Sequence, residues 1–491
     1  MLSRQFEAAL RIVETLRAEG HQALFAGGCV RDLLLGREPV DYDVATSATP
    51  DVVLNLFPRT FAVGAHFGVV LVADETLDET PPLEDAGDAG PRYSVTEVAT
   101  FRSDAAYSDG RHPDAVRYTE SAKEDVQRRD FTINGLLLDP MNLISQGLKP
   151  VSLLAPAADT TKIVPLQGGG VRGAVLDYVG GVADLDAGVI RAIGEPRRRF
   201  EEDQLRLLRA VRFAARFGYA LEPATRAAVC ALALRIHSVS RERVRDELTK
   251  MLTEGRARQA FELLDETGLL VHVLPEIAKM KGVEQPPQFH PEGDVYVHTL
   301  MLLEQLQPGC ARTLAWGALL HDVGKPPTFR VADRIRFDGH VEVGVAMGAE
   351  ICRRFRFSNE DTHQILALID NHMRFADAPR MKASTLKRVF RLPCFQEHLA
   401  LHKMDCLAAH ANLEIYKFVE ERYQSMPEGQ VSPLPLLTGR ELIAAGYAPG
   451  PQFRAMLRAA EDAQLDGIVN TTDEAMALVW EQFGPAERTP A

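Results

Sequence analysis

The stretch FAGGCVRDLLLGREPVDYDVATSATP, residues 25–50, decides how the rest of the chain is interpreted. It begins as an apolar strand, turns at Gly27-Gly28 and continues with the apolar spacing of a helix. Glycines at such a turn let the backbone approach a triphosphate, and the N–H groups of the helix N-terminus favour a bound anion. We therefore expect Gly27, Gly28 and Arg31 to contact nucleotide phosphates, although a Gly-Gly turn is common without this role.

Two aspartates, Asp41 and Asp43, begin ten residues after Arg31. The segment PVDYDVATSA alternates like a strand, so both carboxylates are expected on one face. Paired carboxylates near a phosphate site can hold the metal ions that activate a hydroxyl and neutralise a leaving pyrophosphate. Because these ligands are hard oxygens, Mg²⁺ is the expected ion. A solvated strand end is the alternative interpretation.

Together, GG-x-V-R-D and D-x-D resemble the signature of the class II tRNA nucleotidyltransferase and poly(A) polymerase family, a branch of the polymerase-β-like superfamily. The resemblance implies that Asp41 and Asp43 bind metal and that Gly28 and Arg31 contact the nucleotide. It also implies an α+β fold, in which a nucleotidyltransferase head with a mixed sheet precedes an all-α neck and body and an all-α HD domain.

Two further head segments agree with this resemblance. Glu97 lies on a predicted strand and would supply a third catalytic carboxylate, with a partly buried salt bridge to Arg102 as the alternative. The polar loop at 104–117 resembles the family's flexible loop, which helps the site switch from CTP to ATP.

RRDFTIN, residues 128–134, resembles the family motif R-R-D-x-T-I-N-A. The resemblance implies that Arg129 contacts the nucleotide, whereas Asp130 and Asn134 are equally suited to bracing the fold. Gly135 stands where the family usually has Ala.

The segment EDQLRLLRAVRFAAR, residues 202–216, is predicted to form one helix with its arginines in an arc of roughly 120°. A solvated face would mix Lys and Glu, whereas a row of arginines suits phosphate and base-edge contacts. The segment resembles the family's E-D-x-x-R motif, which implies that Asp203 and Arg206 read the Watson–Crick edge of the incoming base. Arg209 and Arg212 match further nucleotide contacts.

A second constellation of histidines and aspartates lies in predicted helices further along the chain. Imidazole and carboxylate groups suit a divalent transition metal or Mg²⁺, and such sites activate water for phosphoester hydrolysis. The pattern resembles the HD superfamily, in which the fold can persist without useful activity. The resemblance implies the metal ligands His298, His321, Asp322 and Asp405, with His340 and His372 as candidates for a second ion and Lys325 for a phosphate contact.

Composition and spacing divide the 491 residues into several parts. Two stretches, about 74–91 and 141–173, are predicted to be mobile surface insertions, the first because it is acidic and rich in Pro and Gly. The predicted parts are a catalytic head (1–195), a helical neck and body for base and tRNA binding (196–285), an HD domain (286–425) and a helical tail (426–491).

The overall charge, the hydropathy and the cysteines indicate the cellular compartment of the protein. The net charge is −13, but phosphate binding depends on local patches, and arginines cluster at 197–216 and 235–245. No apolar run is long enough to span a bilayer, and the six scattered cysteines form no C-x-x-C pair. These features favour a cytoplasmic protein with reduced thiols and no membrane partner, and they leave the oligomeric state open.

The resemblance implies addition of CMP, CMP and AMP to the 3′ end of tRNA from CTP and ATP. Poly(A) polymerase, or an enzyme that adds only A or only CC, remains an alternative. PRTFAVGAHFGVVLV lacks the R-R-F-x-L-A-H segment usual in the poly(A) polymerases, and the loop at 104–117 argues against CC-only addition. A further alternative is an HD phosphohydrolase whose degenerate transferase domain only binds RNA.

Overall fold

The computed structural model describes residues 3–61, 68–74, 94–104, 116–141, 175–286 and 293–485. The chain forms two compact units, the first comprising Met1–Glu247 with Glu262–Val273 and the second Leu248–Phe261 with Leu274–Ala491. Apart from Asp74 and Met141, both predicted insertions lie outside the described residues, as does most of the predicted flexible loop. The finer division into four parts stays a prediction.

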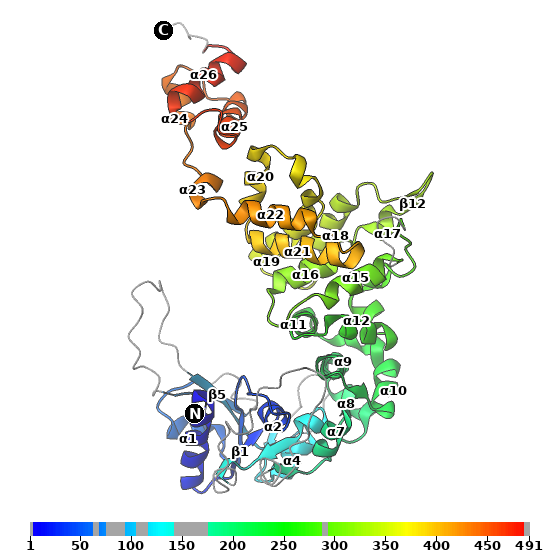
Figure 1. The fold of residues 1–491 in the computed structure, drawn as a ribbon. Helices are drawn as coiled ribbons and strands as arrows, with labels where there is room; N and C mark the ends of the chain where they lie inside the picture. The colour runs from blue at the N-terminus through cyan, green and yellow to red at the C-terminus, as the bar shows by residue number, and fades with distance from the viewer. Residues whose placement is uncertain are drawn as a thin grey trace. The chain divides into compact units, whose positions relative to one another are not determined.

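A seven-stranded mixed sheet forms the centre of the first unit, with strand order β3-β4-β5-β2-β1-β8-β9 (Figure 1). Only β2 and β5 run parallel, and every other pair in this sheet is antiparallel. The short strands β1 and β8 are apolar and buried along their whole length, because α1 and α2 pack against them. The strands are β1 (Ala23–Ala26), β2 (Val44–Thr46), β3 (Thr60–Phe61), β4 (Val69–Asp74), β5 (Ser94–Thr100), β8 (Leu136–Leu138) and β9 (Val175–Asp177).

The head helices begin where the sequence places their caps. Ser3 accepts a hydrogen bond from the Phe6 N–H at the start of α1, and Pro50 occupies the first turn of α3 after Thr49. The helices are α1 (Arg4–Ala18), α2 (Gly28–Leu34), α3 (Pro50–Leu56), α4 (Ala122–Gln127) and α7 (Gly181–Ala187).

Helices dominate the chain after the sheet, but the predicted helix over 202–216 is wrong at its start. Asp203 has φ −143° and ψ 106°, so it separates α8 (Pro196–Glu202) from α9 (Leu205–Phe217). The Asp203 side chain accepts a hydrogen bond from the Leu205 N–H at 3.1 Å, and such a local bond competes with helix continuation. The helices that follow α9 are α10 (Pro223–Leu232), α11 (Arg241–Thr253), α12 (Ala257–Glu266) and α13 (Leu270–Val273).

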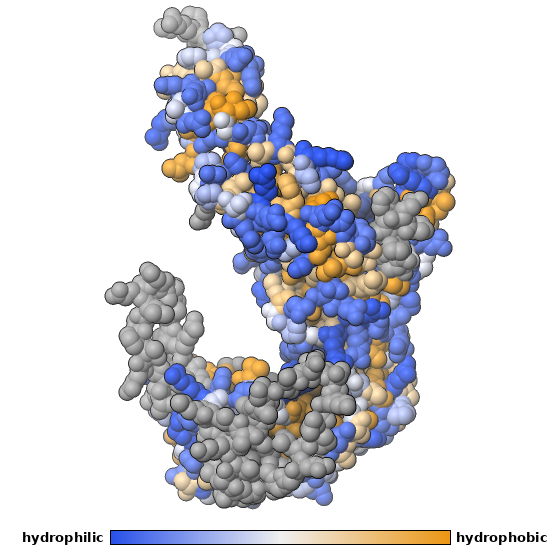
Figure 2. Space-filling view, in the orientation of Figure 1, coloured by the Kyte–Doolittle hydropathy of each residue, from blue (hydrophilic) through white to orange (hydrophobic). Residues whose placement is uncertain are grey.

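The second unit is helical apart from the short hairpin of β12 (Arg330–Val331) and β13 (Ile335–Arg336). No helix in the described part of the chain is long and apolar enough to cross a membrane. In Figure 2 most of the visible described surface is hydrophilic, with an apolar group over α24–α26. Its main helices are α15 (Val295–Glu304), α16 (Arg312–Leu320), α17 (Lys325–Thr328), α18 (His340–Arg354), α19 (Asn359–Asn371), α20 (Ala383–Phe390), α21 (Phe395–Ala409), α22 (Glu414–Gln424), α24 (Gly439–Ala444), α25 (Gln452–Leu465) and α26 (Thr472–Phe483).

Packing explains why Gly135 departs from the family's usual Ala. A Cβ atom at this position would lie 2.9 Å from Val179 Cγ2, 3.1 Å from Ile193 Cδ1 and 3.2 Å from Val126 Cγ1. Three branched side chains therefore fill the space that an alanine methyl group would need.

We expect Gly135→Ala to destabilise the head by about 1–2 kcal/mol. The added methyl group overpacks the site, and this destabilisation exceeds the stabilisation that alanine gives by lowering the conformational entropy of the unfolded chain. Amide hydrogen exchange of β8 should become faster, and Gly135→Ala with Val179→Ala should restore the slower exchange. An unchanged exchange rate in the single variant would show that the three surrounding side chains move aside without loss of stability.

Candidate active site and metal centre

A buried tyrosine fixes the two aspartates of the D-x-D pair. The Tyr42 ring lies 5.4 Å from the rings of both Phe6 and Phe25, and only 3% of this residue is exposed. Alternation along extended backbone then turns Asp41 and Asp43 away from this aromatic cluster. The pair lies at the entrance of β2 and not within the strand as predicted, although the Asp43 carbonyl accepts from the Ala26 N–H and continues the pairing with β1.

Glu97, on β5, completes a group of three carboxylates. Burial, Glu97 and Asp41 together raise the pKa of Asp43 to about 7. Burial and Asp41 likewise raise the pKa of Glu97, while the positive charge of Arg129 opposes both shifts. Carboxylates that destabilise one another's charge in this way suit a bound divalent cation.

The Gly27-Gly28 turn lies beside this group. Gly27 has φ +73°, in the left-handed region that favours glycine, and a Cβ there would lie 3.1 Å from Arg129 Nη1. Arg129 in turn donates from Nη2 to Asp125 at 3.1 Å. The motif thus brings together the turn and Arg129, as a nucleotide site requires, but their contact with a nucleotide stays a prediction.

Arg31 is buried under the turn. Its Nη1 donates to Asn134 Oδ1 at 2.6 Å, its Nε donates to Asp32, and its guanidinium carbon lies 4.7 Å from the centre of the Phe217 ring. Burial lowers the pKa of Arg31, and Asp32 opposes that shift. The expected phosphate contact of Arg31 therefore competes with internal partners.

The arginines of α9 are engaged inside the first unit. Arg209 donates from Nε to Asp130 at 2.8 Å, and Arg212 donates to Glu247 at 2.7 Å. Burial alone would raise the pKa of Asp130, but Arg209 and Asn134 outweigh it and lower the pKa to about 2. Asp130 thus braces the fold, one of the two roles the sequence allowed, and this arginine row is not a solvated face.

Asp203 and Arg206 lie close together at the start of α9. Arg206 is 9% exposed and donates to Glu202 and to the carbonyl of Arg128. Asp203 pairs with Arg243 of α11, a residue that sequence reasoning missed. The only signal for Arg243 was its place in the arginine-rich stretch 235–245.

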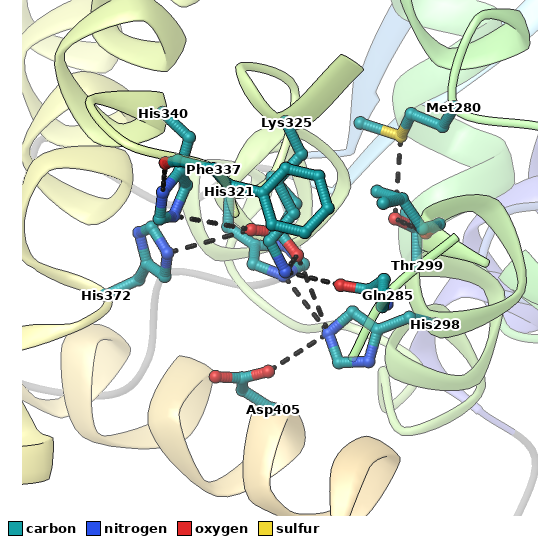
Figure 3. Close-up of polar contacts among 12 residues, drawn as sticks. Met280, Gln285, His298, Thr299, His321, Lys325, Phe337, His340, His372 and Asp405 are labelled. Carbon is teal, nitrogen blue, oxygen red and sulfur yellow. Dashed lines mark hydrogen bonds and ion pairs between the residues drawn. The ribbon is translucent and has the colours of Figure 1, made fainter. Parts of the chain in front are cut away.

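In the second unit, the histidines and aspartates form two groups whose ligand atoms lie within 4.8 Å of one another. Figure 3 shows His298 facing Asp405, with His340 beside His372. His298 Nε2 lies 3.1 Å from Asp405 Oδ1 and 3.4 Å from His321 Nε2. The groups are His298, His321 and Asp405, and Asp322, His340 and His372.

Asp322 connects the two groups. Its Oδ2 lies 3.2 Å from His321 Nε2 and 3.8 Å from His298 Nε2, while its Oδ1 lies 3.9 Å from His340 Nε2 and 3.8 Å from His372 Nε2. One carboxylate therefore faces all four imidazoles, a suitable position for a ligand shared by two ions.

Backbone carbonyls orient the imidazoles. The Nδ1 atoms of His321, His340 and His372 lie 2.7–3.0 Å from the carbonyls of Ala318, Phe337 and Ile369. The buried Nε2 atoms of His340 and His372 have no hydrogen-bond partner among the described residues. Burial lowers the pKa of His372 to about 4 and lowers that of His340, so both rings stay neutral at pH 7 and can bind metal.

Lys325 and Gln285 border the Asp322 side of this centre. Lys325 Nζ lies 2.7 Å from Asp322 Oδ2 and donates to Gln285 Oε1 at 2.6 Å. The other amide atom of Gln285, Nε2, is buried without a partner in the described structure. The sequence had suggested Lys325 as a phosphate contact, but Gln285 carried no motif and was missed.

The fold and these residues are similar to a nucleotidyltransferase head followed by an HD-type domain. Three family models match the chain: the poly A polymerase head domain over residues 23–147, the probable RNA and SrmB-binding site of polymerase A over 218–281, and the HD domain over 295–408. These matches bear out the predicted resemblance to the class II tRNA nucleotidyltransferase and poly(A) polymerase family and the predicted HD domain.

Similar proteins include two CCA-adding enzymes. The one from Geobacillus thermodenitrificans is 37% identical over 274 residues, so the chain spans about half of that relative's length (56%). The one from Levilactobacillus brevis is 29% identical over 457 residues, which cover 93% of this chain and 92% of the relative. Among solved structures, the Bacillus stearothermophilus CCA-adding enzyme in complex with CTP has a TM-score of 0.68 and 26% identity, with 98% of both chains covered.

The raised pKa of Asp43 predicts how the stability of the protein depends on pH. Because the folded chain holds this proton up to about pH 7, whereas the unfolded chain loses it near the ordinary value of 3.8, stability without metal falls as pH rises between these values. We expect Asp43→Asn to melt at a higher temperature than the wild type in EDTA at about pH 8, with a smaller difference at about pH 5. Mg²⁺ should stabilise the wild type more than Asp43→Asn, because the variant lacks one of the three head carboxylates. A difference that does not depend on pH would contradict this account.

The position of Asp322 predicts how metal binding responds to substitution. Asp322→Asn should weaken the binding of both ions at the HD centre, whereas Asp405→Asn should weaken mainly the binding of the ion beside His298 and His321. Titration of metal-free protein with Co²⁺, followed by the visible absorption of the bound ion, distinguishes these outcomes. Equal loss in the two variants would argue against a shared ligand.

Proposed function

We propose that the chain adds C, C and A in turn to the 3′ end of tRNA, using CTP and ATP and releasing pyrophosphate. The observation that carries this proposal is the group formed by Asp41, Asp43 and Glu97 beside the Gly27-Gly28 turn, in which burial and mutual repulsion raise the pKa of two carboxylates. The CCA-adding relatives support the choice of reaction.

The head residues divide the chemistry between them. Members of this family use divalent metal ions, and the hard oxygens of Asp41, Asp43 and Glu97 suit Mg²⁺. When bound, such ions activate the 3′-hydroxyl and stabilise charge on the phosphates. The N–H groups of the glycine turn, with Arg129, bind and orient the triphosphate, so most of the catalytic effect comes from positioning and charge.

Base selection uses protein side chains in place of a template. Asp203 accepts from the exocyclic amine that cytosine and adenine share, and Arg206 donates to ring acceptors. Arg209 and Arg212 fix the position of α9 through their ion pairs with Asp130 and Glu247. They therefore act on the nucleotide indirectly, by positioning this helix. The match of residues 218–281 to a probable RNA-binding site supports contact with the tRNA acceptor arm. We place the protein in the cytoplasm.

The test is extension of three tRNA transcripts that end before CCA, after C and after CC, each with Mg²⁺ and ATP, CTP or both. We expect the first transcript to gain C, C and A and then stop. Asp43→Asn should lower the rate by about 10³-fold or more, since it removes a metal ligand. A long A tail would indicate a poly(A) polymerase, addition of only C or only A would indicate a partial enzyme, and no extension would refute the proposal.

A second activity, phosphoester hydrolysis by the HD centre, is supported by the shared position of Asp322 between four imidazoles. Hydrolysis of p-nitrophenyl phosphate and bis(p-nitrophenyl) phosphate with added Mn²⁺, Co²⁺ or Mg²⁺ tests it. Asp322→Asn should abolish release of p-nitrophenol and leave tRNA extension intact. Hydrolysis that survives this substitution would assign it to another site or to a contaminant.

A further inference from the structure

The carboxylate of Asp203 is held on two sides, although it lies at a break between helices. The Leu205 N–H donates to Oδ1 at 3.1 Å. Nη2 of Arg243, forty residues further along the chain, lies 3.1 Å from Oδ2 and 3.4 Å from Oδ1. The side chains of Asp203 and Arg243 are only 18% and 27% exposed, so water screens this pair weakly.

Counting the acceptor positions shows what this arrangement leaves open. A carboxylate has about four lone-pair positions, two on each oxygen. Leu205 and Arg243 take both positions on Oδ1, and Arg243 takes one on Oδ2. Among the described contacts, a single acceptor position therefore remains, on Oδ2.

Most of the hydrogen-bond donors of Arg206 are likewise occupied by partners within the protein. Nη1 donates to the Arg199 carbonyl and to Glu202 Oε2, each at 3.2 Å, and Nη2 donates to the Arg128 carbonyl at 3.1 Å. Of the five N–H donors of a guanidinium, one on Nη2 and the one on Nε stay available within the described structure. One acceptor from Asp203 beside donors from Arg206 matches the amine and ring acceptors of cytosine and adenine.

We propose that Arg243 is a positioning residue for base selection, because it fixes the one open acceptor position of Asp203. Uracil and guanine present a carbonyl where cytosine and adenine present an amine, and a fixed carboxylate repels that carbonyl. Without Arg243 the Asp203 side chain can rotate to accept the ring N–H of uracil or guanine. This inference rests on the proposed CCA addition and deepens it.

The test compares nucleotide preference in the full-length chain. A transcript lacking CCA is extended with CTP or UTP alone, and a transcript ending in CC with ATP or GTP alone, and kcat/KM is measured for each. Arg243→Gln removes the contacts and Arg243→Lys keeps the charge without the planar fork. The matched control is Arg241→Gln, which removes the same charge two residues away on α11.

We expect Arg243→Gln to lower the CTP/UTP and ATP/GTP ratios about tenfold, as for loss of a charge-assisted contact that orients the base reader. Arg243→Lys should lie between this variant and the wild type, and Arg241→Gln should keep the wild-type ratios. If Arg243→Gln fails to fold, as judged by circular dichroism, Arg243→Lys must still show the lower ratios.

Unchanged ratios with uniformly lower rates would overturn the inference, because they would show a purely structural role. The same ratios in Arg241→Gln and Arg243→Gln would also overturn it. If the wild type adds no nucleotide to either transcript, the proposed function itself fails, and that failure is visible before any variant is compared.

Discussion

The ion pair between Arg209 and Asp130 is the contact on which the arrangement of the first unit depends. Asp130 also accepts from Asn134 Nδ2 at 3.1 Å, and Asn134 Oδ1 accepts from Arg31. Arg31 then stacks on Phe217, at the end of the helix that carries Arg209. The contacts therefore form a closed ring that starts and ends on α9. Removal of Arg209 would leave the largely buried Asp130 carboxylate without its main ion-pair partner, and such a loss typically costs about 3–5 kcal/mol.

This ring explains why motif residues lie far apart in sequence yet act at one place. It ties α9, which begins at the proposed base-reading pair, to the glycine turn and the RRDFTIN segment of the head. The carboxylate group of Asp41, Asp43 and Glu97 has the opposite character, since its members repel one another. The head thus combines a rigid, neutralised support with a carboxylate group suited to cations, and preorganisation of this kind is what the proposed phosphoryl transfer requires.

Local signals in the sequence predicted the elements that local forces determine. The strand, turn and helix over 23–34 and the three carboxylates follow from neighbouring residues and appear in the structure. The break at Asp203 was missed, because it depends on a side-chain bond to Leu205 and on Arg243. Helical periodicity alone cannot show that an arginine face is packed against buried acids.

The HD centre shows the same limit. All six candidate ligands could be named from the sequence, but the shared position of Asp322 depends on how α15, α16, α18, α19 and α21 pack, and Gln285 lies outside any motif. In both units the sequence predicted which residue types matter, and the tertiary contacts decide which of them support and which of them face the substrate.

In the proposed reaction, side chains of this protein, and no nucleic-acid template, read the incoming base. Equilibrium dialysis of each of the four nucleoside triphosphates against the protein with Mg²⁺ and no RNA tests this base selection. We expect CTP and ATP to bind, and UTP and GTP to bind at least about tenfold more weakly, because their hydrogen-bonding edges are mismatched. Equal affinity for all four nucleotides would show that the protein alone does not select the base.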